Sequence, residues 1–320
     1  MAKYALRRLV LILPTLVLLS MLVFLVMRVL PGDVARTIMG EEVGATNVTI
    51  KMSLETLRHR LGLDKPLYIQ YLDWLWHLAR LDFGDSLISG KSIAAEIVQR
   101  APITLELAVI AKIISLVLGI PIGILSAVRQ NSWLDLILRF WTIFFLAAPS
   151  FWMALMVIFV GAYSFGWLPP LGYHSLWSDP RGNLTQLMWP ALILSLGSLA
   201  TMARMTRSTM LEVMREDYIR TARAKGLKEQ VVIMRHALKN TLIPVVTLAG
   251  LSFATLLGGS VIMEAIFGIP GMGQYLITAI SNHDYTVVQG TVVVFAVVVM
   301  LINLIIDLFY GWIDPRISYS

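Results

Sequence analysis

The stretch that decides the architecture of this chain is Glu216–Pro244, EDYIRTARAKGLKEQVVIMRHALKNTLIP. It is the longest polar interruption in the apolar second half of the sequence. Gly226 divides it into two predicted short helices, because glycine readily adopts the left-handed conformation that ends a helix. Tyr218, Ile219 and Ala222 form a narrow apolar face on the first helix. Such a hairpin between two membrane helices suits docking to a partner at the membrane surface; a basic loop without a partner is the alternative.

Composition places the chain in a membrane. Of its 320 residues, 57% are hydrophobic and only 14% are charged, and several apolar runs approach the length that a bilayer core requires. The absence of cysteine excludes disulfides, thiolate metal sites and cysteine nucleophiles. The net charge is +6, but residues 204–239 alone hold nine Lys/Arg against four Asp/Glu. This concentration indicates membrane topology, and nucleic acid is not an expected partner.

The apolar segments predict an all-α membrane protein with six transmembrane helices. The first, residues 9–27, is too long for a signal peptide and has no small-residue cleavage pattern, so we expect it to be retained. The other five are expected at 103–127, 136–163, 188–206, 241–263 and 288–311. Pro149 lies in the middle of a predicted span and should kink it, whereas Pro190 is expected near a helix start.

Residues 31–100 form a mixed-charge segment with two predicted helices, Ser53–Leu61 and Tyr68–Ala79. We therefore divide the chain into 1–100, the first transmembrane helix with an external segment, and 101–320, a five-helix transport core whose cytoplasmic hairpin occupies 212–240. Lys and Arg are abundant before the first span and in the second-to-third and fourth-to-fifth loops, and scarce in the other short loops. By the positive-inside rule both termini and the hairpin are cytoplasmic.

The hairpin also resembles a known motif. Asp217–Gly226 is similar to the coupling segment (EAA motif) of ABC importer permeases, in the form used by the dipeptide/oligopeptide/nickel family. Arg220-Thr221-Ala222 occupy the Glu-Ala-Ala positions and Gly226 matches the glycine of that pattern, but Lys239 stands where the general pattern has proline. Further segments that resemble the same family are Leu30–Asp33, Leu61–Leu67, Phe83–Ser86 and Asp314–Arg316.

The resemblance implies a MetI-like permease subunit of an ATP-driven importer that carries di- or oligopeptides, or related small solutes, across the cytoplasmic (inner) membrane. It also implies a homologous second permease in a heterodimer, two cytoplasmic ATPase subunits that bind ATP and Mg, and an external solute-binding protein. This chain itself would bind no cofactor and catalyse no reaction. The residues that would couple it to the ATPases are Glu216, Asp217, Tyr218, Arg220, Thr221, Ala222, Arg223, Lys225 and Gly226. Among these, Ala222 would form the contact and Gly226 the turn.

A second motif, Glu264–Gly273, follows the fifth predicted span. Its glycines and proline forbid a continuous helix, so a tight external loop is the simplest interpretation. The segment also resembles the family's Glu-x-x-Phe-x-x-Pro-Gly-x-Gly sequence near the outer mouth of the pathway. The residues of this hypothetical outer gate are Glu264, Phe267, Pro270, Gly271 and Gly273.

Charges inside predicted spans are functional candidates because they are costly there. Lys112 could meet a peptide carboxylate in a cavity, although a contact between helices is the alternative. Asp307 shares a helix face with Asn303 and is expected either to snorkel to the cytoplasmic surface or to pair with a basic neighbour such as Arg139. Gly119–Gly123 is a small-xxx-small pattern, which predicts close helix packing.

Other chemistries find little support. Ser89–Ser92 resembles part of a P-loop, but Asp85 stands where the first glycine is needed. The five histidines are scattered, and neither a metal-ligand pair nor a nucleophile elbow is present. A channel or secondary transporter without ATPase partners is the main alternative, and a membrane-bound scaffold or enzyme is another. Co-purification with ATPase chains would distinguish the ABC importer permease from both alternatives.

Overall fold

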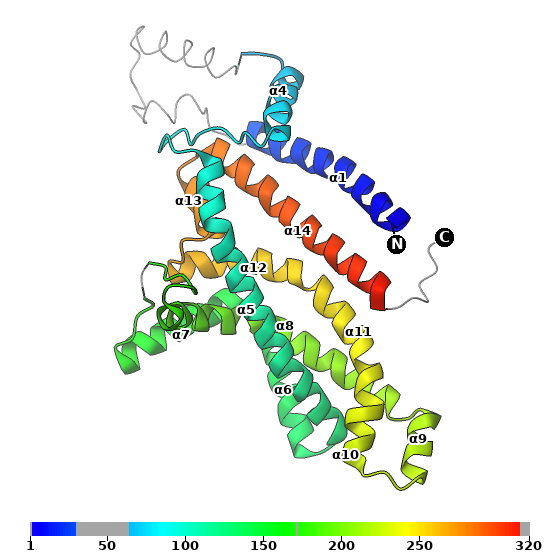
Figure 1. Ribbon diagram of the computed structural model, residues 1–320. Helices are drawn as coiled ribbons and strands as arrows, with labels where there is room; N and C mark the ends of the chain where they lie inside the picture. Colours follow the sequence, from blue (N-terminus) through cyan, green and yellow to red (C-terminus); the bar gives the residue numbers. More distant parts are fainter. Residues whose placement is uncertain (1, 30–63, 171, 314–320) are drawn as a thin grey trace. The chain divides into compact units, whose positions relative to one another are not determined.

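The computed structural model describes the backbone of residues 2–29, 64–170 and 172–313, and the side chains of these residues except 2–9, 29 and 307–313. The described residues are predominantly helical, with one isolated antiparallel bridge between Asp85 and Ser92 (Figure 1). The predicted helix at 53–61 and the motifs at 30–33 and 314–316 lie outside the described residues, as do the first three residues of the motif at 61–67.

The helices follow one another along the chain. They are α1 (Ala2–Val29), α4 (Leu67–Ala79), α5 (Ile93–Val128), α6 (Trp133–Ala147), α7 (Ser150–Phe165), α8 (Pro180–Val213), α9 (Asp217–Ala224), α10 (Glu229–Val231), the π-helical turn η1 (Val232–Ala237), α11 (Leu238–Leu251), α12 (Phe253–Phe267), α13 (Met272–Ser281) and α14 (Tyr285–Ile313). From α8 onward, each connection between consecutive helices has four residues or fewer. The helix expected at 68–79 is confirmed as α4.

Five stretches are long and apolar enough to cross a membrane: Val10–Arg28, Ile93–Val128, Pro180–Val213, Glu229–Leu251 and Tyr285–Ile306. Two sharply bent helix pairs raise this number to seven if each pair counts as one span. The pair α6 and α7 turns by 103°, and the pair α12 and α13 turns by 70°. The all-α membrane fold is thus confirmed, although the spans are less regular than the six predicted ones.

The bends lie at identifiable residues. Ala148 and Pro149 have extended backbones between α6 and α7, so the kink expected at Pro149 is confirmed as a full break. The single span expected at 241–263 is wrong, because the helix is interrupted at Ser252 between α11 and α12. Pro190 does not begin a helix either: Pro180 holds that position, and Pro190 lies buried inside α8.

The chain forms two compact units. The described parts of residues 1–102 together with 274–304 make up one unit, and residues 103–273 with 305–313 make up the other. In the second unit, side chains of α5, α7, α8 and α12 share a buried core that includes Leu107, Met153, Ala191 and Met263. The small residues predicted to allow close packing do so, since the α-carbons of Gly119 and Gly123 face the backbone of α8.

Candidate coupling site

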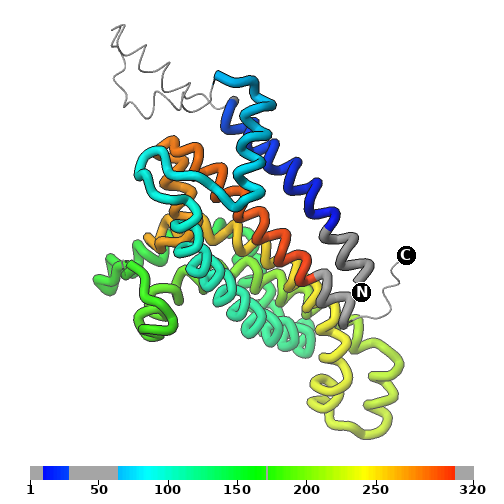
Figure 2. The backbone as a smooth tube through the Cα atoms, turned by 45° about the horizontal axis from the view of Figure 1, so that its top comes forward, coloured from blue at the N-terminus to red at the C-terminus, as the bar shows by residue number. Residues whose placement is uncertain are grey.

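The hairpin that follows α8 consists of two helical segments joined by a tight turn. α9 ends at Ala224, Gly226 adopts φ +77°, and α10 begins at Glu229. The predicted break at Gly226 is therefore confirmed. α10 continues through the wider π-helical turn η1 into α11, a feature that the sequence pattern did not reveal. Figures 1 and 2 show the hairpin at the ends of α8 and α11.

The hairpin rests on a small apolar base. Ile219 and Ala222 of α9, which are 0% and 6% exposed, pack with Val232 and Ala237 of the second segment. Met210 of α8 and Ala127 of α5 complete this base. Ala222 therefore faces its own chain. Its small side chain allows α9 to lie close to α8, and the expected contact between Ala222 and a partner stays a prediction.

The other predicted coupling residues lie on the surface of the hairpin. They are Glu216, Asp217, Tyr218, Arg220, Thr221, Arg223, Lys225 and Gly226. A Cβ atom added at Gly226 would meet no atom of the chain within 4 Å. The glycine is therefore required by the positive φ of the turn and not by crowding within this protein.

Two polar contacts brace the hairpin. Arg223 donates from Nη2 and Nε to the Glu229 carboxylate at 2.7 and 3.1 Å, across the Gly226 turn. The hydrogen bond to Glu229 raises the pKa of Arg223 above its ordinary value. Asn240 of α11 donates from Nδ2 to Tyr218 Oη at 2.7 Å. Both ends of α9 are thus connected to the segment that follows.

Sequence reasoning missed a buried ion pair just behind this base. Asp135 of α6 is fully buried, and both Nε and Nη2 of Arg207 on α8 donate to its carboxylate at 2.9 Å. Ser126 Oγ at 2.5 Å and the Asn131 amide at 3.0 Å donate to the same carboxylate. Arg207 lies one helical turn before Met210, so the pair joins the α5–α6 turn to the helix that supports the hairpin. The available signal was Asp135, a carboxylate among the apolar residues of 133–138.

The segment expected to form an outer gate is a tight turn after α12. Gly268, at φ +65°, ends the helix, and Glu264 is fully buried. The Glu264 carboxylate accepts a 2.6 Å hydrogen bond from the Gly273 amide, while Thr104 Oγ1 of α5 accepts one of 2.9 Å from the Met272 amide. Phe267 is also buried, at 3% exposure, within the core of this unit.

Crowding explains the two later glycines of this turn. A Cβ atom at Gly271 would lie 2.5 Å from Glu264 Cδ and 2.7 Å from Thr104 Oγ1. One at Gly273 would collide with Val261 and come within 2.9 Å of Glu264 Oε2. The motif thus allows the backbone to wrap closely around a buried carboxylate.

Lys112 lies between three helices. Its Nζ donates to Ser252 Oγ at 2.6 Å, at the break between α11 and α12, and to Ser198 Oγ of α8 at 3.5 Å. Ser198 Oγ in turn donates to Ser115 Oγ at 3.3 Å. These hydrogen bonds favour the interpretation that Lys112 joins helices over the interpretation that it binds a peptide carboxylate. Asp307 falls outside the described side chains, so its pairing with Arg139 stays a prediction.

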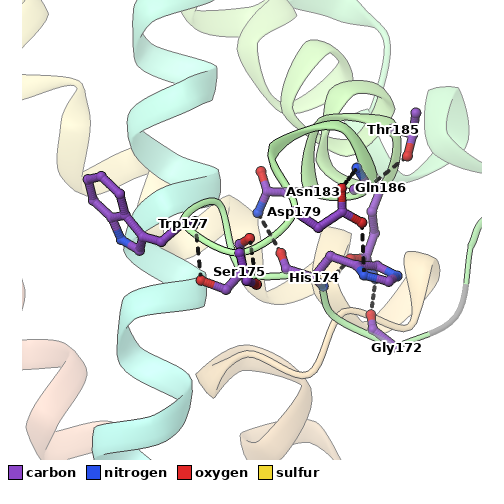
Figure 3. A network of polar contacts seen from close by, with 10 residues as sticks. Gly172, His174, Ser175, Trp177, Asp179, Asn183, Thr185 and Gln186 are labelled. Carbon is purple, nitrogen blue, oxygen red and sulfur yellow. Dashed lines mark hydrogen bonds and ion pairs between the residues drawn. The ribbon is translucent and has the colours of Figure 1, made fainter.

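The loop between α7 and α8 is held by its own polar network (Figure 3). Asp179 caps α8 by accepting from the Gly182 amide at 2.9 Å, and it lies 3.4 Å from His174 Nδ1. Asn183 Nδ2 donates to the His174 carbonyl at 2.8 Å, and Gln186 Nε2 donates to the Gly172 carbonyl. His174 therefore has a structural role. Within the described residues, no three His, Asp or Glu side chains are placed to hold a metal ion.

Tyr173, which lies between Gly172 and His174, ties this loop to α5. Tyr173 Oη donates to Glu106 Oε2 on α5 at 2.6 Å. Burial, together with the hydrogen bond to this carboxylate, raises the pKa of Tyr173.

Comparisons with known proteins identify the class. Residues 119–319 match the family described as "Binding-protein-dependent transport system inner membrane component", and residues 1–108 match "Binding-prot-dependent transport system membrane comp, N-term". The chain belongs to this family. It is a multi-pass inner-membrane permease of an ABC importer and not itself an enzyme, as the resemblance of residues 217–226 predicted. A permease of this kind works with ATPase and binding-protein partners.

Curated relatives match the whole chain. The dipeptide transport system permease protein DppB of Alkalihalophilus pseudofirmus is 40% identical over 340 residues. The glutathione transport system permease protein GsiC of Salmonella choleraesuis is 38% identical over 320 residues, and in both cases 100% of each chain is covered. The solved inward-facing MetNI methionine ABC transporter is 22% identical with a TM-score of 0.55, covering 68% of this chain and 96% of that one. This likeness shows the fold, MetI-like as predicted.

Proposed function

We propose that this chain is one of two homologous permease subunits that together form the pathway of an importer for short peptides. The cargo class rests on relatives named for dipeptide, di/tripeptide and glutathione transport, which match the chain over its full length. A heterodimer is the expected arrangement, with two ATPase subunits that bind ATP and Mg on the cytoplasmic side and one solute-binding protein outside.

The hairpin of α9 and α10 is proposed to dock onto an ATPase subunit. The observation that carries this proposal is a polar, exposed outer face on a buried apolar base that reaches α8 and α5. Asp217, Arg220 and Thr221 would contact the partner, and Lys225 and Gly226 would form the tip. ATP would act by binding one conformation of the assembly better than the other, and the hairpin would transmit this free-energy difference to the helices.

The proposed orientation places the hairpin and both termini in the cytoplasm. It is supported by the excess of Lys and Arg in residues 204–239 and by their scarcity in the loop between α7 and α8. In this orientation the Glu264–Gly273 turn lies at the outer mouth. Because it is bound to α5 through Thr104, the turn would move together with α5 and act as part of the outer gate.

The docking role is tested by two substitutions at one position. Asparagine tolerates positive φ far better than valine, so Gly226→Asn should preserve the turn whereas Gly226→Val should strain it. We expect Gly226→Val to abolish ATP-dependent uptake while the permease still inserts in the membrane. Comparison with Gly226→Asn separates the two causes: uptake retained by the asparagine variant assigns the defect to backbone conformation, and uptake lost in both assigns it to bulk at the docking surface.

The ATPase partnership has its own test. The permease, solubilised in mild detergent, should co-purify with ATPase chains, and Gly226→Val should weaken this association or its stimulation of ATP hydrolysis. Normal uptake by Gly226→Val would refute the docking role. Full-rate transport in vesicles that lack any ATPase would instead support the channel or secondary-transporter alternative.

A further inference from the structure

Helix α4 packs one of its faces against α1. Tyr71 Oη donates to the Val17 carbonyl at 3.1 Å and lies 3.0 Å from Ser20 Oγ. The ring of Phe24 contacts those of both Tyr71 and Trp74, with centroids 5.5 and 6.1 Å apart. Because these contacts include two polar ones, the position of α4 along α1 is fixed and does not depend on apolar contact alone. Figure 1 shows α4 at the C-terminal end of α1.

A second face of α4 is polar and its charges are paired locally. Asp73 lies 3.5 Å from Lys65 Nζ, and His77 Nδ1 lies 3.0 Å from Asp82 Oδ2. The four side chains are at least half exposed. This face therefore suits water or lipid headgroups.

The third face is apolar and open. Tyr68, Leu72 and Trp76 recur every four residues, so they lie in one row along the helix. They are 66%, 59% and 58% exposed. The guanidinium of Arg80 lies 4.5 Å from the centre of the Trp76 ring, at the end of the row. An aromatic and aliphatic row that ends in a stacked arginine is the composition found where a protein meets the membrane–water interface.

The contacts with α1 also place α4 beside the membrane. Val17, Ser20 and Phe24 all fall inside the membrane-spanning stretch Val10–Arg28. A helix that touches them lies at the level of the bilayer, where an open apolar face meets lipid tails. With 13 residues, α4 is about 20 Å long and too short to cross the membrane. Because it also carries the charged face of Asp73 and His77, the position that keeps this face in water and the apolar row in lipid is along the surface, with the backbone hydrogen bonds satisfied within the helix.

We propose that α4 is an interfacial helix whose Tyr68–Leu72–Trp76 row is embedded in the bilayer, with Arg80 at the level of the lipid phosphates. The helix would hold the segment between α1 and α5 to the membrane surface. The inference concerns the lipid surface and is independent of which solute is carried or how the ATPases dock.

The chain contains no cysteine, which makes single-cysteine labelling a direct test. Tyr68→Cys and Leu72→Cys report on the open face, and Asp73→Cys, the immediate neighbour of Leu72, reports on the polar face. Each full-length variant, co-purified with its partner subunits, is reconstituted in phosphatidylcholine–phosphatidylglycerol vesicles. One portion is labelled with an environment-sensitive fluorophore and exposed to spin-labelled lipids, and another is treated with a membrane-impermeant maleimide.

We expect spin-labelled lipid to quench the probe at 68 and 72 and not the probe at 73. The maleimide should react roughly tenfold more slowly at 68 and 72 than at 73. A factor of this size is within what the transfer of one leucine-sized side chain from water to lipid can supply. Equal reactivity at all three positions without quenching would place the row in water and overturn the proposal. Protection at 68 and 72 without quenching would also overturn it, because a protein chain and not lipid would then cover the face. Size-exclusion profiles check that each variant is folded. If one of the two open-face variants does not fold, the other is enough for the test.

Discussion

Arg207 on α8 holds the buried carboxylate of Asp135 on α6 through two hydrogen bonds of 2.9 Å. The Asp135 side chain is 0% exposed and that of Arg207 is 21% exposed. Such a pair stabilises little by itself relative to apolar neighbours, but removing one partner leaves an uncompensated buried charge. Because the pair lies one turn from Met210, it fixes the α5–α6 turn to the base under the hairpin.

The first prediction concerns this pair. Arg207→Met leaves the Asp135 carboxylate buried without its cation, so we expect a loss of stability of about 3–5 kcal/mol, measured by denaturation of the purified complex. Arg207→Lys keeps the charge but loses the two-pronged geometry and should cost less. Arg129→Met, at an exposed arginine of the α5–α6 turn, is the control and should change little. A stable Arg207→Met variant would show that the pair does not hold these helices together.

The second prediction concerns the turn around Glu264. Gly271→Ala places a methyl group 2.5 Å from Glu264 Cδ and should destabilise the protein by about 1–3 kcal/mol through overpacking. Gly258→Ala, in α12 of the same region, meets no atom within 4 Å and should be neutral or slightly stabilising. Thermal midpoints and uptake rates of the two variants are compared. Equal behaviour would contradict the crowding argument.

The third prediction concerns the contact of α5 with α8. A Cβ atom at Gly123 would lie 2.5 Å from the Ala203 carbonyl oxygen and 2.6 Å from Thr206 Cβ. Gly123→Leu should therefore separate the two helices and sharply reduce the yield of folded permease. Gly197→Leu adds the same bulk on α8 at a position where an added Cβ atom would meet no atom within 4 Å, so this substitution should be tolerated. The yield of monodisperse protein after size exclusion measures the difference.

The fourth prediction concerns Lys112. If its role is to join helices, Ser252→Ala removes the acceptor of the 2.6 Å hydrogen bond and should lower stability by about 1–3 kcal/mol, without changing the concentration of peptide that half-saturates uptake. Lys112→Met should likewise lower stability and leave the half-saturating peptide concentration unchanged. A large rise of that half-saturating concentration in Lys112→Met, with normal stability, would instead support a contact between Lys112 and a peptide carboxylate.

Much of the architecture could be predicted from local patterns. The apolar runs predicted membrane helices because a bilayer core sets their length, and Pro149 predicted a kink because proline cannot continue the helical hydrogen bonding. The interruption at Ser252 was not predictable, since serine in an apolar helix gives no comparable signal. It becomes understandable only with Lys112 beside it, supplied by α5.

For the candidate site, the sequence alone determined the hairpin, its turn at Gly226 and its family, because positive φ, charge and motif spacing are properties of consecutive residues. Only the tertiary structure decided that Ala222 faces inward, that Asp135 pairs with Arg207, and that Glu264 is enclosed by glycines 271 and 273. These contacts join helices distant in the sequence or depend on how closely the backbone folds back on itself. Their side-chain partners are therefore set by packing in three dimensions, which no local pattern records.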